Sequence, residues 1–306
     1  MLPNNNKTII NKLAKNSVKT NKKQYAILFF TIILSSFMLF CVFTIGMTYL
    51  DSSRLQNTRL NGVEYDIAAM NGFTSEQLNT LRQNEHIRSV GMESYAGFIQ
   101  STEYDETVEV GLLWCDEVFW DNLMSPARTK LDGHYPQNKN ELMVTKDILK
   151  TCGNENLSVG DSLILTYANN TGVYTDEFII SGIWDGYGDT SAGFVSKAFY
   201  DETGYDLKND GILCIKLNRN YVFPATIQSI EKSLDFSDRQ IFAPTSYIEN
   251  SFKLLLGICG LALVICLSAY LLIYNILYLS VSGKIRYYGL LQSLGMTKKQ
   301  LVRFII

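Results

Sequence analysis

The chain has 306 residues, of which 47% are hydrophobic, and a formal net charge of −3. These averages are ordinary for a soluble protein, but charge is absent from two long runs, residues 25–50 and 254–283. A helix needs roughly 20 apolar residues to cross a hydrocarbon core about 30 Å thick. Both runs exceed that length, which argues against a wholly soluble protein and predicts two transmembrane helices.

The charged residues indicate the orientation of these spans. Residues 1–24 carry six lysines and residues 284–306 carry five basic residues, with no acidic residue in either segment. All 30 acidic residues therefore lie in 51–253, where 16 basic residues leave a net charge of −14. Basic flanks stay on the cytoplasmic side of a membrane. We expect both ends in the cytoplasm and residues 51–253 outside it, in the plasma membrane of the cell.

The N-terminal segment, 1–24, places Ile9, Ile10, Leu13 and Val18 at roughly helical spacing among its lysines. This pattern predicts an amphipathic helix at the inner membrane surface, and a disordered basic tail is the alternative. The span that follows, 25–50, is too long for the apolar core of a signal peptide and lacks a small-residue cleavage site. We interpret it as a retained signal anchor.

The outer segment, 51–253, reads as a mixed α and β domain. Thr74 and Gln77 have the spacing of a capping box at the start of a helix that ends near Arg82, and residues 169–172 are suited to a hairpin turn. Pro224 suits the first position of a helix that continues through Leu234. Strands are predicted at Tyr65–Met70, Ile87–Met92, Tyr95–Gln100, Thr107–Trp114, Glu141–Val144, Ser162–Tyr167, Glu177–Ile183 and Gly211–Leu217, with a polar helical turn at Asp116–Leu123.

Two subdomains are expected in this outer segment. Segments around 57–105 and 205–250 would form a mixed α/β part near the membrane, and roughly 106–200 would form a β-rich insertion. Of the six cysteines, Cys115, Cys152 and Cys214 lie in this segment. One disulfide and reduced, buried thiols are both compatible with that odd number.

The remainder of the chain consists of a second span and a short basic segment. A helix beginning near Thr245 or Ser246 is predicted to run without a break into the span at 254–280, which would link the outer domain to the membrane. The predicted organisation is a cytoplasmic segment (1–24), a first span (25–50), an outer domain (51–253), a second span (254–280) and a cytoplasmic segment (281–306).

Three stretches of the outer domain carry a recognisable order of motifs: Gly133-His134-Tyr135-Pro136 followed by Asn140-Glu141-Leu142-Met143-Val144, then Leu157 to Leu163 with Gly160-Asp161, then Phe178 to Ile183 with Gly182. Together they resemble the outer domain of the FtsX/MacB-like superfamily of ABC transporter permeases. The resemblance implies structural roles for Gly133, Pro136, Asn140, Glu141, Gly160, Asp161 and Gly182.

The strongest similarity to that superfamily follows the second span. Residues Ser280 to Leu301 contain Tyr288-Gly289-Leu290-Leu291, then Leu294-Gly295-Met296-Thr297, then Lys298-Lys299-Gln300. The Tyr288-Gly289 variant resembles the long permeases of Gram-positive bacteria. The resemblance implies a coupling element that docks on an ATPase. Its expected residues are Gly289, Leu290, Leu291, Leu294, Gly295, Met296 and Thr297.

The glycines of this segment allow a bend or a close backbone approach, and its leucines offer an apolar face to a partner. Lys298, Lys299 and Arg303 would contact anionic lipid. A membrane-surface helix without a partner is the alternative on composition alone. The chain stops at Ile306, where residues 301–306 resemble the approach to another span, so we expect an N-terminal part of a longer permease.

The sequence contains no Gly-x-x-x-x-Gly-Lys-(Ser/Thr) motif and no hydrolase signature. We therefore expect no enzyme activity, no cofactor and no metal on this chain, with ATP bound by a separate cytosolic ABC ATPase. The other expected partners are a second permease copy or half, membrane lipid, and an extracellular peptide or protein, but no nucleic acid. A two-span receptor that senses an outer ligand is the alternative function.

Overall fold

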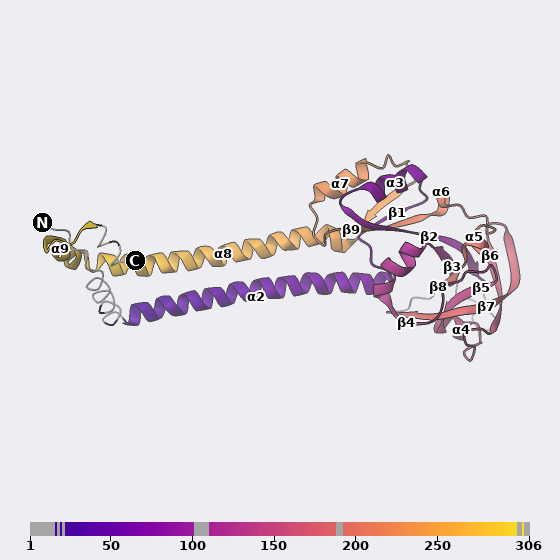
Figure 1. The fold of residues 1–306 in the computed structure, drawn as a ribbon, viewed down its shortest axis with the longest axis horizontal. Helices are drawn as coiled ribbons and strands as arrows, with labels where there is room; N and C mark the ends of the chain where they lie inside the picture. The colour runs from indigo at the N-terminus through magenta and orange to yellow at the C-terminus, as the bar shows by residue number, and fades with distance from the viewer. Residues whose placement is uncertain are drawn as a thin grey trace. The chain divides into compact units, whose positions relative to one another are not determined.

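The computed structural model describes residues 16, 19, 22–100, 110–187, 192–298 and 302. The chain divides into two compact units, one made of Met1–Tyr49 with Leu255–Ile306 and the other of Leu50–Leu254. Two long helices, α2 (Lys22–Asn61) and α8 (Ser246–Ser282), each begin in one unit and end in the other. Figure 1 shows both as unbroken ribbons.

In the first unit, α2 and α8 pack against each other. A Cβ added at Gly46 of α2 would lie 2.6 Å from the Ile258 side chain of α8, so the two helices approach closely at this glycine. Most of the other apolar side chains are exposed, for example Phe30 at 66% and Leu279 at 67%. Both helices are long and apolar enough to cross a membrane, and their exposed apolar surface is unlike that of a buried core helix. The predicted pair of long apolar helices is confirmed.

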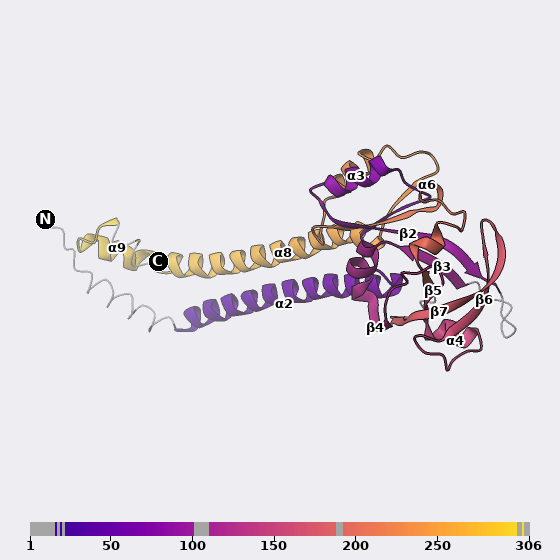
Figure 2. The same ribbon diagram turned by 45° about the vertical axis from the view of Figure 1, so that its right-hand side comes forward.

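In the second unit, four strands form an antiparallel sheet in the order β10 (Ile241–Pro244), β1 (Ile67–Met70), β9 (Ile212–Leu217) and β2 (Ile87–Ile99). Two helices cover it, α3 (Ser75–Gln83) and α7 (Pro224–Lys232). Figure 1 shows both close to β1 and β9, and Figure 2 shows α3 from a second direction. Leu81 and Ile230 from these helices pack with Ile67 and Ile215 from the sheet in one apolar cluster. The predicted capping box of α3 is present.

Strand β2 also belongs to a second, closed ring of strands. Its first half, through Glu93, pairs with β9, and its second half, from Glu93, pairs with β3 (Val110–Cys115). The ring continues through β8 (Ala192–Val195), β5 (Glu141–Thr145), β7 (Gly172–Gly186) and β6 (Ser162–Asn169), which returns to the end of β2. Alternate residues such as Leu112, Leu142, Leu163 and Phe178 fill the interior.

The remaining elements extend or cover this ring. Strand β4 (Arg128–Gly133) pairs with the last residues of β7. Short helices follow β5 and β8, namely α4 (Lys146–Thr151) and α5 (Lys197–Tyr200), and α6 (Leu207–Asp210) precedes β9. A π-helical turn, η1 (Val118–Leu123), and a 3-10 turn, η2 (Ser125–Ala127), connect β3 to β4. The buried side chains of η1 contribute to a third apolar cluster, which also contains Met143, Trp184, Phe194 and Cys214.

The α+β prediction for the outer domain is confirmed, with corrections in detail. Ile87–Met92 and Tyr95–Gln100 are not separate strands but one continuous β2, since Glu93 and Ser94 also pair with β3. The helical turn predicted at Asp116–Leu123 is present as η1, but it is not polar, because Phe119, Trp120 and Leu123 are buried. All six cysteines are free thiols. The predicted amphipathic helix at 1–24 and residues 107–109 of a predicted strand lie largely or wholly outside the described residues.

Candidate functional site

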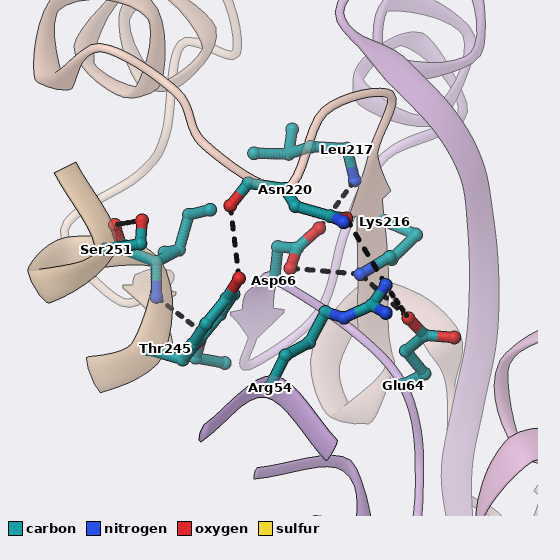
Figure 3. Close-up of polar contacts among 10 residues, drawn as sticks. Arg54, Glu64, Asp66, Lys216, Leu217, Asn220, Thr245 and Ser251 are labelled. Atoms are coloured by element: carbon teal, nitrogen blue, oxygen red, sulfur yellow. Dashed lines mark hydrogen bonds and ion pairs between the residues drawn. The ribbon is translucent and has the colours of Figure 1, made fainter. Parts of the chain in front are cut away.

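A buried ionic network lies where both long helices enter the folded domain. We call it the joint, and it consists of Arg54, Glu64, Asp66, Lys216 and Asn220. Lys216 Nζ lies 3.2 Å from Asp66 Oδ1 and 3.1 Å from Glu64 Oε1. Figure 3 shows these groups converging between β1 and β9. Lys216 is 5% exposed and Asp66 is 1% exposed, so this is an internal ion pair and not a surface one.

The joint contacts the ends of both long helices. Arg54, near the end of α2, places its Nη1 3.6 Å from Glu64 Oε1 and 3.4 Å from Asn220 Oδ1. On the side of α8, the Tyr247 hydroxyl donates to the Asn220 carbonyl at 3.3 Å. The Thr245 amide, just before α8, donates to the Asp66 carbonyl at 2.8 Å. A displacement of either helix end would therefore act on the same few residues.

The electrostatics of the joint favour a fixed geometry. Burial raises the pKa of Asp66, and the attraction of Lys216 and the hydrogen bond from the Leu217 amide oppose that shift. The Leu217 amide donates to Asp66 Oδ2 at 2.9 Å. Because removing one partner of a buried pair leaves an uncompensated charge, the two side chains depend on each other. The contacts of the joint are ion pairs and hydrogen bonds that connect the two helix ends to β1 and β9.

The motif residues of the outer domain meet around one short stretch of β7, Ile179–Gly182. Gly133 pairs with Gly182, and the Asn140 carbonyl accepts from the Ile179 amide at 2.8 Å. The Gly160 amide donates to the Ile180 carbonyl at 2.8 Å, and the Asp161 carbonyl accepts from the Ile180 amide at 2.9 Å. Backbone hydrogen bonds thus hold the three motif segments against one strand.

Gly133 requires glycine for steric reasons, and Gly182 is closely surrounded. Gly133 has a φ of +86°, and a Cβ there would lie 2.2 Å from the Ser181 carbonyl oxygen. A Cβ at Gly182 would lie 2.6 Å from the end of the Met143 side chain. Gly160 differs, because its φ is +96° but no atom lies within 4 Å of the added Cβ. Its glycine serves backbone conformation alone.

The acidic motif residues act as local caps, and Pro136 is buried in the loop between β4 and β5. Glu141 Oε2 accepts from the Gln137 and Asn138 amides at 2.7 Å and 3.1 Å. Partial burial would raise the pKa of Glu141, but these hydrogen bonds outweigh it and the pKa is lowered. Asp161 Oδ2 accepts from the Ser158 amide at 2.8 Å. Each carboxylate therefore closes a tight turn.

The segment after the second long helix forms α9 (Ile285–Ser293) and a glycine turn. The Gly295 amide donates to Gln292 and the Met296 amide donates to Leu291, each at 3.0 Å. This pair of bonds, with a φ of +98° at Gly295, is a Schellman motif that ends the helix. Gly289 lies within α9 with no atom within 4 Å of an added Cβ, so no close approach occurs there within the described chain.

The leucines of α9 and its turn have large exposed areas. Leu290 is 62% exposed and Leu294 is 81% exposed, while Leu291 is partly buried and Met296 is partly buried. The basic residue Lys298 lies four residues after Leu294 and is exposed. Large apolar side chains exposed beside basic ones form a surface suited to a partner.

Sequence reasoning did not single out the joint. The available signal was a lysine in the middle of an otherwise apolar strand, Ile212–Leu217, and an aspartate directly before the apolar strand Ile67–Met70. Charged residues in such strands are almost always paired. Their partner could not be read from the sequence, because Asp66 and Lys216 are 150 residues apart. Among the described residues, no cluster of His, Cys, Asp and Glu is arranged to hold a metal ion.

No protein-family model matches the sequence, and no curated protein matches it. Solved structures do match. One is the periplasmic region of MacB from Actinobacillus actinomycetemcomitans, with 13% identity and a TM-score of 0.43, covering 63% of this chain and 95% of that one. Another is the extracellular domain of the noncanonic ABC-type transporter YknZ from Gram-positive bacteria, with 12% identity and a TM-score of 0.38, covering 58% and 98%.

Proposed function

We propose that this chain is a permease subunit of an ABC transporter of the FtsX/MacB type. A separate cytosolic ATPase binds and hydrolyses ATP and acts on α9 and its turn, and the two long helices transmit the movement to the outer domain. Both ends of the chain lie in the cytoplasm, and residues 51–253 lie outside the membrane. The outer domain handles a peptide, a lipid-linked substrate or a partner protein, and a second permease copy or half completes the assembly.

The exposed leucines of α9 and its turn are the observation that carries this proposal. Leu290 and Leu294 lie in the motif that most resembles the permease superfamily, and they are exposed at 62% and 81%. An apolar surface in a basic segment next to a membrane span is suited to a protein partner, because water is a poor solvent for it. The joint supports the proposal from the other end, since it fixes both helix ends to β1 and β9.

Affinity purification from membranes in mild detergent tests this proposal. We expect the wild-type protein to recover an ATPase with a P-loop and the ABC signature, and the Leu290→Asp/Leu294→Asp variant to lose it. The matched control is Leu131→Asp/Ile164→Asp, which adds the same charges at two exposed apolar positions of the outer domain and should retain the ATPase. Loss of the ATPase from both variants, or its absence from wild type, would contradict the coupling role.

A further inference from the structure

A cavity of about 210 Å³ lies within the third apolar cluster of the outer domain. Its wall comes from both halves of the domain: β1 and β9 of the open sheet, and β3, β7 and β8 of the ring, together with η1. The largest lining side chains are Tyr65, Met70, Leu113, Phe119, Trp184 and Phe194. Cavities between two structural parts with mostly apolar walls are the usual form of a small-molecule site.

Glu93 is the carboxylate that lines this cavity. It is the residue at which β2 changes partners, since it pairs with Ile212 of β9 and with Cys115 of β3. It lies on the same face of β2 as Gly91, where a Cβ would collide with Phe119 and Leu123. The strand pairing on both sides and the packing of η1 therefore hold the Glu93 carboxylate toward the apolar cavity.

Glu93 lacks the compensation that Asp66 receives. Asp66 has Lys216 and a backbone amide, whereas the partner found for Glu93 in the described chain is the weak donor Cys214 Sγ, at 3.8 Å from Oε1. No ion pair to Glu93 occurs among the described residues. Loss of solvation raises the pKa of Glu93 to about 7, although the Cys214 bond opposes it. Glu93 as a whole residue is only partly buried, but its carboxylate has no counter-charge and lines a mostly apolar cavity. Such a placement is costly, and a bound cation would lower that cost.

We propose that this cavity binds a small hydrophobic ammonium ion, with its nitrogen against Glu93 and its apolar body among the aromatic side chains. A cavity of about 150 Å³ accepts benzene, so the larger volume here suits one ring with a short aliphatic arm. Aromatic faces near an ammonium group add a cation–π attraction. The carboxylate would repel an anion of the same size. This site is independent of ATPase coupling, and either proposal can fail without the other.

The ionisable groups around Glu93 make binding depend on pH in one direction. Glu93 acts electrostatically on Tyr65, Cys115 and Cys214, and burial raises the pKa of all three, so they remain neutral near pH 7. Asp116 and Arg128 are the charged groups near Cys115, and burial raises the pKa of Asp116 and lowers that of Arg128. Glu93, with a pKa of about 7, is the group whose titration falls in this range. Between pH 8 and pH 6 we expect the affinity for an ammonium ion to fall about tenfold, because the ionised fraction of Glu93 falls by that factor.

Calorimetric titration of the full chain in lipid nanodiscs tests the site, with 2-phenylethylammonium as the probe and 2-phenylethanol as its neutral analogue. At pH 8 we expect the ammonium ion to bind at least tenfold more tightly than the alcohol, and Glu93→Gln to abolish that preference. Each probe partitions into the nanodisc lipid to the same extent with wild type and with the variant, so this contribution cancels when the two proteins are compared. The tryptophan fluorescence of Glu93→Gln should match that of wild type.

Equal binding of the two probes to wild type, or an affinity for the ammonium ion that is unchanged by Glu93→Gln, would overturn the proposal. If Glu93→Gln fails to fold, the comparison of the two probes on wild type and the pH profile still decide it. An affinity for the ammonium ion that rises from pH 8 to pH 6 would also overturn it, since protonation of Glu93 removes its attraction for a cation.

Discussion

The side chain of Lys216 is buried at the joint together with the carboxylate of Asp66. The burial of both groups would be unfavourable if either were alone. Their pairing, and the amide of Leu217 on the second carboxylate oxygen, reduce that cost. At the scale of single residues, the joint is therefore a place where two charges hold each other and the backbone that surrounds them.

We expect Lys216→Met to lower the free energy of unfolding of the outer domain by about 3–5 kcal/mol, because it leaves Asp66 buried without a counter-charge. The double variant Asp66→Asn/Lys216→Met should lose clearly less, since neither charge remains. Urea unfolding in detergent micelles followed by tryptophan fluorescence measures this, because all three tryptophans, Trp114, Trp120 and Trp184, lie in the outer domain. A double variant as unstable as the single one would show that the ion pair is not the cause.

At the scale of elements, β7 is the strand on which the motif residues converge. Gly133 and Gly160 both have positive φ values, but only Gly133 faces backbone atoms at contact distance. The two glycines therefore separate the cost of an unusual backbone conformation from the cost of a collision.

We expect Gly160→Ala to destabilise the outer domain by about 1–2 kcal/mol, which is the cost of the left-handed conformation for a residue with a Cβ. Gly133→Ala should cost at least about 2 kcal/mol more, because the Ser181 carbonyl must also move and the β4–β7 pairing is disturbed. The same urea unfolding measurement compares them. Equal losses would mean that β4 shifts freely and that the close contact with the Ser181 carbonyl does not affect stability.

The sequence predicted the elements whose signals are local. The capping box at Thr74, the turn at 169–172 and Pro224 at a helix start depend on neighbouring residues, and each occurs in the structure. Strands β4, β8 and β10 were not predicted, because they owe their conformation to pairing with distant strands. The same limit applies to sites: the α9 leucines follow from a local motif, whereas the joint and the Glu93 cavity require long-range contacts.

At the scale of the whole molecule, the distribution of charge and the two long apolar helices predict which parts of the chain face each side of the membrane. Ile164, at 68% exposure, lies in the outer domain, and Leu294, at 81%, lies after the second long helix. Both side chains are exposed, so a membrane-impermeant thiol reagent can show on which side of the membrane a cysteine at each position lies.

In a background without Cys41, Cys152, Cys259 and Cys266, we expect Ile164→Cys to react with an impermeant maleimide on intact cells. Leu294→Cys should react only after the cells are made permeable. The two remaining cysteines, Cys115 and Cys214, are buried, and the parent background measures their contribution. Labelling of Leu294→Cys on intact cells would show that this residue lies outside the cell and would contradict the proposed orientation.

The shared strand β2 has a consequence for how such a chain can vary over evolution. Successive residues of a strand face opposite sides, so one inserted residue exchanges the two faces. Because β2 pairs with β9 before Glu93 and with β3 after it, an insertion near Glu93 would turn the ring interior outward while leaving the open sheet intact. Homologues should therefore keep the length of β2 constant and accommodate length changes in the connections between strands, even where nearly every side chain has been replaced.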